Sequence, residues 1–222
     1  TYIREKSPEM PLPPRPAIVI CPGGAYAFTS DREAEPIALR FLDLGFQSFV
    51  LRYSCVPDTA FPGALLELAA SVALVRDRAE EWSIDPDKIF VCGFSAGGHL
   101  AASLGVLWDR AFVAASLGRS ADNVRPNGMI LGYPAISATQ FIDTESIENV
   151  LLGNDTEETR ALAHLEDVQH GADITRTFLN SASIDNDELD SPKMIENYFN
   201  QEARYIEEKQ EFPAEVREDG LR

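Results

Sequence analysis

The ten residues VCGFSAGGHL, Val91 to Leu100, place Ser95 inside the pattern Gly-x-Ser-x-Gly. The apolar run IFVC ends in this pattern and predicts a β-strand, and the small residues that follow predict an α-helix. In a strand-to-helix elbow of this kind the serine takes a strained conformation, and the flanking glycines, here Gly93 and Gly97, let two backbones approach closely. We therefore predict that Ser95 is a nucleophile and not merely the cap of a helix.

A second glycine-rich turn, CPGGAY, follows the strand-like run AIVIC about 70 residues earlier. Acyl transfer needs backbone N–H groups directed at the oxyanion that develops on the substrate. In proteins with a serine elbow of this kind, these N–H groups come from the residue after the serine and from the loop after an earlier strand. We therefore expect the amides of Ala96, Gly24 and Ala25 to form an oxyanion hole.

Strand-like and helix-like runs alternate along the whole chain, and the strands are apolar along their length. This pattern predicts an α/β fold with a mainly parallel sheet covered by helices on both faces, in one domain over residues 1–222. Ligands bind such sheets at the carboxyl ends of the strands. The expected strands are 17–21, 46–53, 88–95, 129–134, 175–180 and 214–216, and the expected helices are 34–41, 62–82, 96–105 and 195–208, with an Asp-Pro-Asp turn at 85–87.

Three segments together resemble a known family: CPGGAYAFTSDREAEPIALRFLDLGFQSFVLRYS, DPDKIFVCGFSAGGHLAASLG and RPNGMILGYPAIS. They are similar to small bacterial α/β-hydrolase esterases, in particular to the acetyl-esterase and acetyl-xylan-esterase-like carboxylesterases, over roughly residues 1 to 160. The resemblance implies an α/β-hydrolase fold, a Ser-His-Asp triad, hydrolysis of short acyl esters, often acetyl groups on sugars, and no cofactor; the three cysteines separately suggest no metal site. It also places Tyr26, Asp31 and Arg32 in a loop at the edge of the active site.

The base of the expected triad is not obvious, because the chain has only three histidines, His99, His164 and His170. His99 lies one helical turn after the serine, so we expect a structural role for it. The resemblance places the base in a Gly-x-His arrangement after the last strand, and that position is occupied by Arg222. A guanidinium stays protonated near neutral pH and cannot act as a general base.

The acid is equally open: the resemblance places it in the loop after 175–180, which reads SASIDNDELDSP, where Asp185 or Glu188 would be the equivalent and where the run also fits a solvated acidic loop. We select Asp185 as the acid and His170 as the base, with His164 as a second possibility. Three explanations for the divergent last third remain open: a truncated chain, a chain that has lost its base, or a histidine supplied from an unusual loop. The first two predict impaired esterase activity or a pseudo-hydrolase that binds an acylated small molecule or sugar.

The charge composition argues against two classes of binding partner. The net charge is −17, and residues 141–222 alone hold 21 acidic and 7 basic side chains. Nucleic acids and anionic membranes need a basic surface, so we expect neither as a partner. No apolar run approaches the roughly 18 residues of a membrane span, and the three cysteines suggest no disulfide framework. We expect a cytoplasmic protein that binds a small ester; its oligomeric state is left open.

Overall fold

The computed structural model of the chain describes residues 1–11, 13–136, 144–163, 165 and 177–180. The chain divides into two compact units, Thr1–Asn180 and Ser181–Arg222, and every described residue belongs to the first. The single domain over residues 1–222 therefore stays a prediction. The helix expected at 195–208 and the strand expected at 214–216 lie outside the described residues.

Within the described residues, five parallel strands form a sheet in the order β2-β1-β3-β4-β5. The parallel sheet that the apolar runs predicted is confirmed, and β3, which leads into Ser95, lies at its centre between β1 and β4. Five residues of β1 in a row are buried, because helices cover both faces of the sheet. The strands are β1 (Arg15–Cys21), β2 (Gln47–Val50), β3 (Ile84–Phe94), β4 (Gly128–Gly132) and β5 (Thr177–Asn180).

Several predicted boundaries are wrong: the strand expected at 46–53, for example, ends at Val50. The helix expected to reach Trp82 ends at Asp77, after which a turn leads directly into β3. The Asp-Pro-Asp turn expected at 85–87 instead lies within β3, where the pairing with β1 shifts register between Arg15 and Ala17. The N–H of Asp87 donates to the carboxylate of Asp85 at 3.0 Å. The turn chemistry is thus present, but it forms an irregularity in a longer strand.

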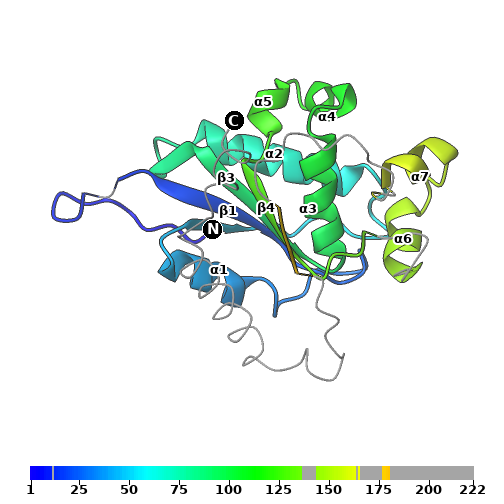
Figure 1. Cartoon of the computed structure of the whole chain (residues 1–222), viewed down its shortest axis with the longest axis horizontal. Helices are drawn as coiled ribbons and strands as arrows, with labels where there is room; N and C mark the ends of the chain where they lie inside the picture. Colours follow the sequence, from blue (N-terminus) through cyan, green and yellow to red (C-terminus); the bar gives the residue numbers. More distant parts are fainter. Residues whose placement is uncertain (12, 137–143, 164, 166–176, 181–222) are drawn as a thin grey trace, which may run out of the picture. The chain divides into compact units, whose positions relative to one another are not determined.

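Helices cover the sheet on both faces, as expected: α1 (Glu35–Asp43) lies on one face and α2 (Gly63–Asp77) and α3 (Ala96–Leu107) on the other (Figure 1). In the part of the chain that the structure describes, four short helices follow that the sequence pattern did not indicate. No helix in the described part of the chain is long and apolar enough to cross a membrane. The short helices are α4 (Ala111–Ser116), α5 (Ala121–Val124), α6 (Thr144–Leu151) and α7 (Glu157–Ala163).

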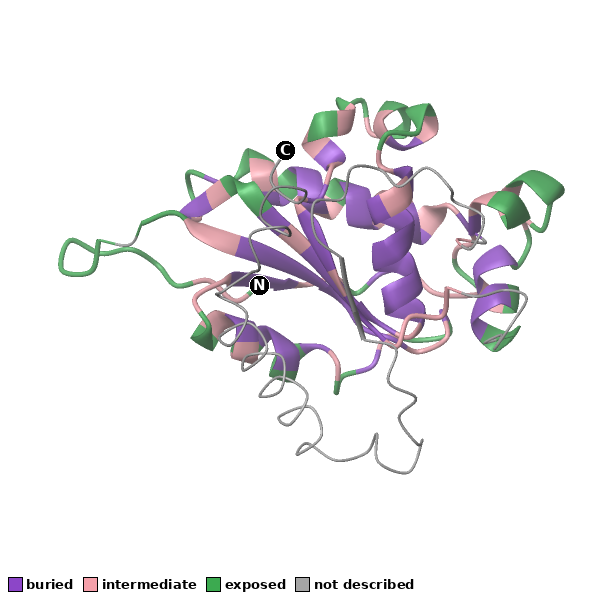
Figure 2. Cartoon of the chain, viewed as in Figure 1, coloured by how far each residue is buried: buried purple, intermediate pink, exposed green. Residues whose placement is uncertain are grey.

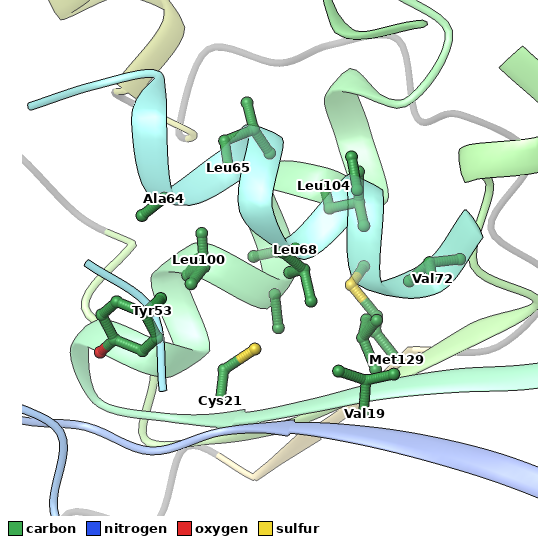
Figure 3. Packing of buried hydrophobic residues seen from close by; sticks show 14 of the residues in the cluster. Val19, Cys21, Tyr53, Ala64, Leu65, Leu68, Val72, Leu100, Leu104 and Met129 are labelled. Carbon is green, nitrogen blue, oxygen red and sulfur yellow. The ribbon is translucent and has the colours of Figure 1, made fainter. Parts of the chain in front are cut away.

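The largest part of the core lies between the sheet and the pair α2 and α3 (Figure 3). Leu68 of α2 and Leu104 of α3 face Val19 of β1, and each of these side chains is at most 1% exposed. Nearly all of α3 is buried, whereas α1 presents one buried face to the sheet (Figure 2). Burial of each such aliphatic side chain contributes about 1.5–3 kcal/mol, so the helix after the serine is firmly held.

Candidate active site

Three loops meet at the carboxyl ends of neighbouring strands β1, β3 and β4. Cys21 pairs with Gly93, and Phe94 pairs with Gly132, so the segments that follow these residues leave the sheet side by side. The loop with the two expected oxyanion donors and the elbow with Ser95 are therefore adjacent, although about 70 residues separate them in the sequence. This is the edge at which parallel sheets bind ligands.

Ser95 itself adopts a backbone conformation that residues with a side chain rarely take, with φ 51° and ψ −121°. Such strain costs on the order of 1–3 kcal/mol and persists only where the surrounding structure enforces it. The Ser95 N–H donates to the carbonyl of Gly132 at 3.1 Å. The Ser95 carbonyl accepts the backbone N–H of His99 at 3.0 Å and that of Ala135 at 3.1 Å. The serine is half-buried at the start of α3.

The elbow glycines have the close contacts that the motif predicted. A Cβ on Gly93 would overlap the carbonyl of Gly97, and a Cβ on Gly97 would overlap the carbonyl of Cys21. Both obstacles are backbone atoms, which cannot move aside as a flexible side chain can. The first turn of α3 therefore packs directly on the end of β3 and on the end of β1.

The loop after β1 contains three consecutive residues with positive φ: Gly24 at 133°, Ala25 at 51° and Tyr26 at 58°. Every carbonyl from residue 22 to residue 26 accepts a hydrogen bond. The donors are Tyr53 Oη to residue 22 (2.6 Å), Ser30 N to residue 23 (2.9 Å), Ala27 N and Phe28 N to residue 24 (2.8 and 3.2 Å), Asn149 Nδ2 to residue 25 (2.8 Å), and Val56 N to residue 26 (2.9 Å).

These bonds also orient the expected oxyanion donors. In a trans peptide the N–H points away from the carbonyl of the same unit, so fixing the carbonyls of residues 23, 24 and 95 fixes the N–H directions of Gly24, Ala25 and Ala96. Within the described part of the chain, the amides of Gly24 and Ala25 donate to no acceptor. Ala96 is the first residue of α3, whose N–H has no partner inside the helix.

Glu33 and Tyr133 form a bridge beside the elbow that sequence reasoning missed. One Glu33 oxygen accepts the N–H of Gly23 at 2.5 Å, and the other accepts the Tyr133 hydroxyl at 2.7 Å. Burial and the nearby Glu33 carboxylate raise the pKa of the Tyr133 phenol, which is therefore a neutral donor. No sequence signal separates Glu33 from its exposed neighbours Asp31 and Glu35, since all three lie in one charged run.

His99 has the structural role expected of it. The ring is 1% exposed, and its Nε2 lies 2.7 Å from the carbonyl of Ala163, while its Nδ1 lies 2.7 Å from the Tyr26 hydroxyl. A carbonyl can only accept, so Nε2 carries the proton and Nδ1 accepts from the tyrosine. Burial raises the pKa of Tyr26, which keeps this hydroxyl protonated.

The edge loop that the resemblance indicated is only partly at a surface. Tyr26 is buried against His99, whereas Asp31 is exposed and pairs with Arg52 at 2.6 Å. The predicted acid and base and their alternatives, Asp185, Glu188, His164 and His170, lie outside the described residues, as does Arg222. The described part therefore brings together Ser95, the expected nucleophile, and the three expected amides, and their catalytic roles stay predictions.

The model of the BD-FAE family matches residues 6–169, which include the elbow and the loop after β1. The chain belongs to the BD-FAE family. Solved structures that match it include α/β hydrolases, and this member of the BD-FAE family has the esterase-like α/β-hydrolase fold. The fold class that the sequence predicted is thus confirmed.

Relatives of this BD-FAE member include the endo-1,4-β-xylanase B of Butyrivibrio fibrisolvens, 32% identical over 68% of the chain and 24% of that protein. The acetylxylan esterase of Xylanibacter ruminicola is 35% identical over 59% of the chain and 25% of that protein. An acetyl ester-xyloside bifunctional hydrolase from Caldicellulosiruptor lactoaceticus has a solved structure that matches with TM-score 0.61 and 30% identity, over 73% of this chain and 58% of that one. The chain thus spans about a quarter of the length of these curated relatives.

Proposed function

We propose that this BD-FAE family member hydrolyses short-chain carboxylic esters, acetyl esters of sugars first of all, through an acyl-enzyme on Ser95. The observation that carries the proposal is the strained conformation of Ser95 beside three oriented backbone amides. Strain at a residue that is not glycine, next to N–H groups that have no acceptor within the described part of the chain, is the arrangement that acyl transfer uses.

In the proposed reaction the Ser95 hydroxyl attacks the ester carbonyl carbon while a base removes its proton. The carbonyl oxygen becomes an oxyanion and accepts hydrogen bonds from the amides of Gly24, Ala25 and Ala96. The carbon–alkoxy bond then breaks, the alcohol leaves with the proton, and water hydrolyses the acyl-serine in the same way. Each well-placed oxyanion donor contributes about 2.7–4 kcal/mol to the stability of the transition state.

The substrate class is proposed from the relatives. Two of them, the acetylxylan esterase and the acetyl ester-xyloside hydrolase, are named for acetyl esters, and all three are named for xylan or a xyloside. An acetyl group is also the smallest common acyl group. We therefore propose acetylated xylo-oligosaccharides as the natural type of substrate for this chain.

The base and acid are proposed as His170 and Asp185, with His164 as the second candidate base. Because Arg222 occupies the position of the expected Gly-x-His histidine, we expect weak turnover from these 222 residues. Loss of a triad base in serine hydrolases typically leaves about 10³ to 10⁴ of acceleration over water from the oxyanion hole and binding alone. A pseudo-hydrolase that binds an acetylated sugar is the alternative outcome.

The decisive experiment measures p-nitrophenyl acetate hydrolysis by the wild-type chain, by Ser95→Ala and by Ser71→Ala. The Ser71 variant is the matched control, because its hydroxyl donates to the carbonyl of Glu67 within α2, far along the chain from the elbow. We expect Ser95→Ala to abolish the protein-dependent rate and Ser71→Ala to leave it unchanged. Equal rates for Ser95→Ala and wild type would refute Ser95 as the nucleophile.

Two additions to the assay resolve the open roles. His170→Ala and His164→Ala test for a base: if the wild type turns over rapidly, a fall of about 10⁴ in one variant marks the histidine that acts on Ser95, whereas a weak rate that neither change lowers means that neither histidine is the base. Acetate release from acetylated xylo-oligosaccharides tests the substrate class. Thermal stabilisation by these sugars without acetate release would favour the binding protein over the esterase.

A further inference from the structure

Glu33 joins the two loops that flank the serine elbow. Its carboxylate accepts the N–H of Gly23 in the loop after β1 and the hydroxyl of Tyr133 in the loop after β4. Hydrogen bonds to an ionised carboxylate are shorter and stronger than bonds between neutral groups. One half-buried side chain thus connects segments on both sides of β3, the central strand of the sheet.

On the β1 side, Gly23 lies between this carboxylate and the nucleophile. A Cβ on Gly23 would lie 2.8 Å from Glu33 Oε2 and 3.1 Å from Ser95 Cβ. The peptide between Pro22 and Gly23 is held at both ends, by Tyr53 at its carbonyl and by Glu33 at its N–H. The next peptide carries the Gly24 N–H, so the position of that donor follows the position of Gly23.

On the β4 side, Tyr133 lies between the two residues that hold the elbow. The carbonyl of Gly132 accepts the Ser95 N–H, and the N–H of Ala135 donates to the Ser95 carbonyl. The latter bond orients the peptide whose N–H belongs to Ala96. The loop after β4 therefore fixes the second group of expected oxyanion donors.

We propose that Glu33 is a positioning residue that holds the Gly24 and Ala96 amides at a fixed separation around the reacting carbonyl. The inference rests on the proposed function of Ser95 and adds a residue to it. Glu33 touches no substrate in this scheme; it acts through Gly23 and Tyr133. A displacement of about 1 Å at such a site typically costs about 10²-fold in rate, so the position of these amides matters for turnover far more than for substrate binding.

The test compares Glu33→Ala, Glu33→Gln and Tyr133→Phe in the ester assay, with kcat and KM measured separately. We expect Glu33→Ala to lower kcat about 10²-fold with KM changed less than about twofold. The side-chain amide introduced by Glu33→Gln can still accept from Gly23 through its oxygen, so we expect this variant to recover most of the lost kcat. Tyr133→Phe removes one of the two bonds and should lower kcat about tenfold.

Glu35→Ala is the matched control, since Glu35 lies two residues further on, is exposed, and contacts the hydroxyl of Tyr2 at 3.2 Å. The rate at which a p-nitrophenyl alkylphosphonate labels Ser95, followed by intact mass, is measured in parallel. This reaction also places an oxyanion in the proposed site, but it needs no hydrolysis of the adduct. Labelling should fall in the same order as kcat.

The outcomes separate the two proposals. If wild type shows neither Ser95-dependent turnover nor labelling, the proposed function fails and the role of Glu33 fails with it. If wild type reacts and Glu33→Ala reacts equally fast, the function stands and the positioning role is overturned. A Glu33→Gln variant faster than wild type would also overturn it, because that result would mean that the carboxylate acts by repelling the oxyanion.

Discussion

Backbone strain is concentrated in the residues around the serine elbow. Among the described residues, five that are not glycine have positive φ, and four of them lie in the loops after β1, β3 and β4. Each costs on the order of 1–3 kcal/mol, so the fold stores more strain here than elsewhere in the described part of the chain. The four are Ala25, Tyr26, Ser95 and Tyr133.

The glycines of this region should tolerate no Cβ, which is a testable property. We expect Gly97→Ala to lower the free energy of unfolding by about 3 kcal/mol or more, because the new methyl group would overlap the backbone carbonyl of Cys21. Gly118→Ala is the control: Gly118 has φ +60° with open space around it, so only the strain of about 1 kcal/mol applies. Urea denaturation measures both. Equal losses would show that crowding at Gly97 is not the constraint.

The short helices α6 and α7 stabilise the conformation of the loop after β1. Asn149 of α6 donates to the carbonyl of Ala25, and Ala163 of α7 accepts from His99, which in turn accepts from Tyr26. The N–H of Phe61 also donates to the carbonyl of Val150 at 2.7 Å. These helices therefore stabilise the loop conformation although they follow it by more than 100 residues.

The Tyr26 and His99 pair should couple the loop to α3 and α7. We expect Tyr26→Phe to lower the free energy of unfolding by about 1–3 kcal/mol, because it removes the donor to a buried ring nitrogen. Tyr2→Phe is the control, since the exposed Tyr2 hydroxyl should contribute less than about 0.5 kcal/mol.

The double variant Tyr26→Phe, His99→Leu completes a double-mutant cycle for this pair. It should cost less than the two single changes together, because the Tyr26 hydroxyl and the His99 Nδ1, each left unpaired by one single change, are then both absent. Urea denaturation of all four proteins gives the coupling. Simple additivity would contradict a direct bond between the two side chains.

Buried thiols and phenols that stay protonated in the folded chain should lower its free energy of unfolding as the pH becomes alkaline. Burial raises the pKa of the thiols of Cys21 and Cys92, and burial together with nearby groups raises the pKa of Tyr26, Tyr53 and Tyr133. The unfolded chain ionises these groups at their ordinary pKa, about 8.5 for thiols and about 10 for phenols. Above those values the folded state holds more protons than the unfolded state, so stability falls as pH rises.

We therefore expect the free energy of unfolding to decline from about pH 8.5 upward, by up to about 1.4 kcal/mol per pH unit for each group that titrates only in the unfolded state. Urea midpoints between about pH 7 and about pH 10.5 measure the decline. A Cys21→Ala, Cys92→Ala variant should show a shallower slope between about pH 8.5 and about pH 10, because two of these groups are gone. An unchanged slope would assign the effect to other groups.

Much of this arrangement could be predicted from local patterns. The Gly-x-Ser-x-Gly elbow, the glycines after AIVIC and the apolar runs can each be recognised within about ten consecutive residues. The order of the strands in the sheet then brings the elbow and these glycines together. Glu33 and Tyr133 could not be predicted, because the bond between them joins residues 100 apart and neither lies in a motif. Asn149 is 124 residues from its partner Ala25 and was missed for the same reason. The sequence boundary of α2 was also missed, since Trp82 continues the apolar spacing after the helix has ended.

The carbonyls of residues 22 to 26 all accept hydrogen bonds, and this determines when the dipoles of the loop are oriented: on folding or during each turnover. Because each of these peptides is held by a named donor, turning its N–H toward a new charge requires no rotation of the backbone. In water, solvent dipoles must reorganise around every oxyanion that forms. Here that reorganisation would be completed once, when the chain folds, and each turnover of the proposed reaction would begin with its dipoles already in place.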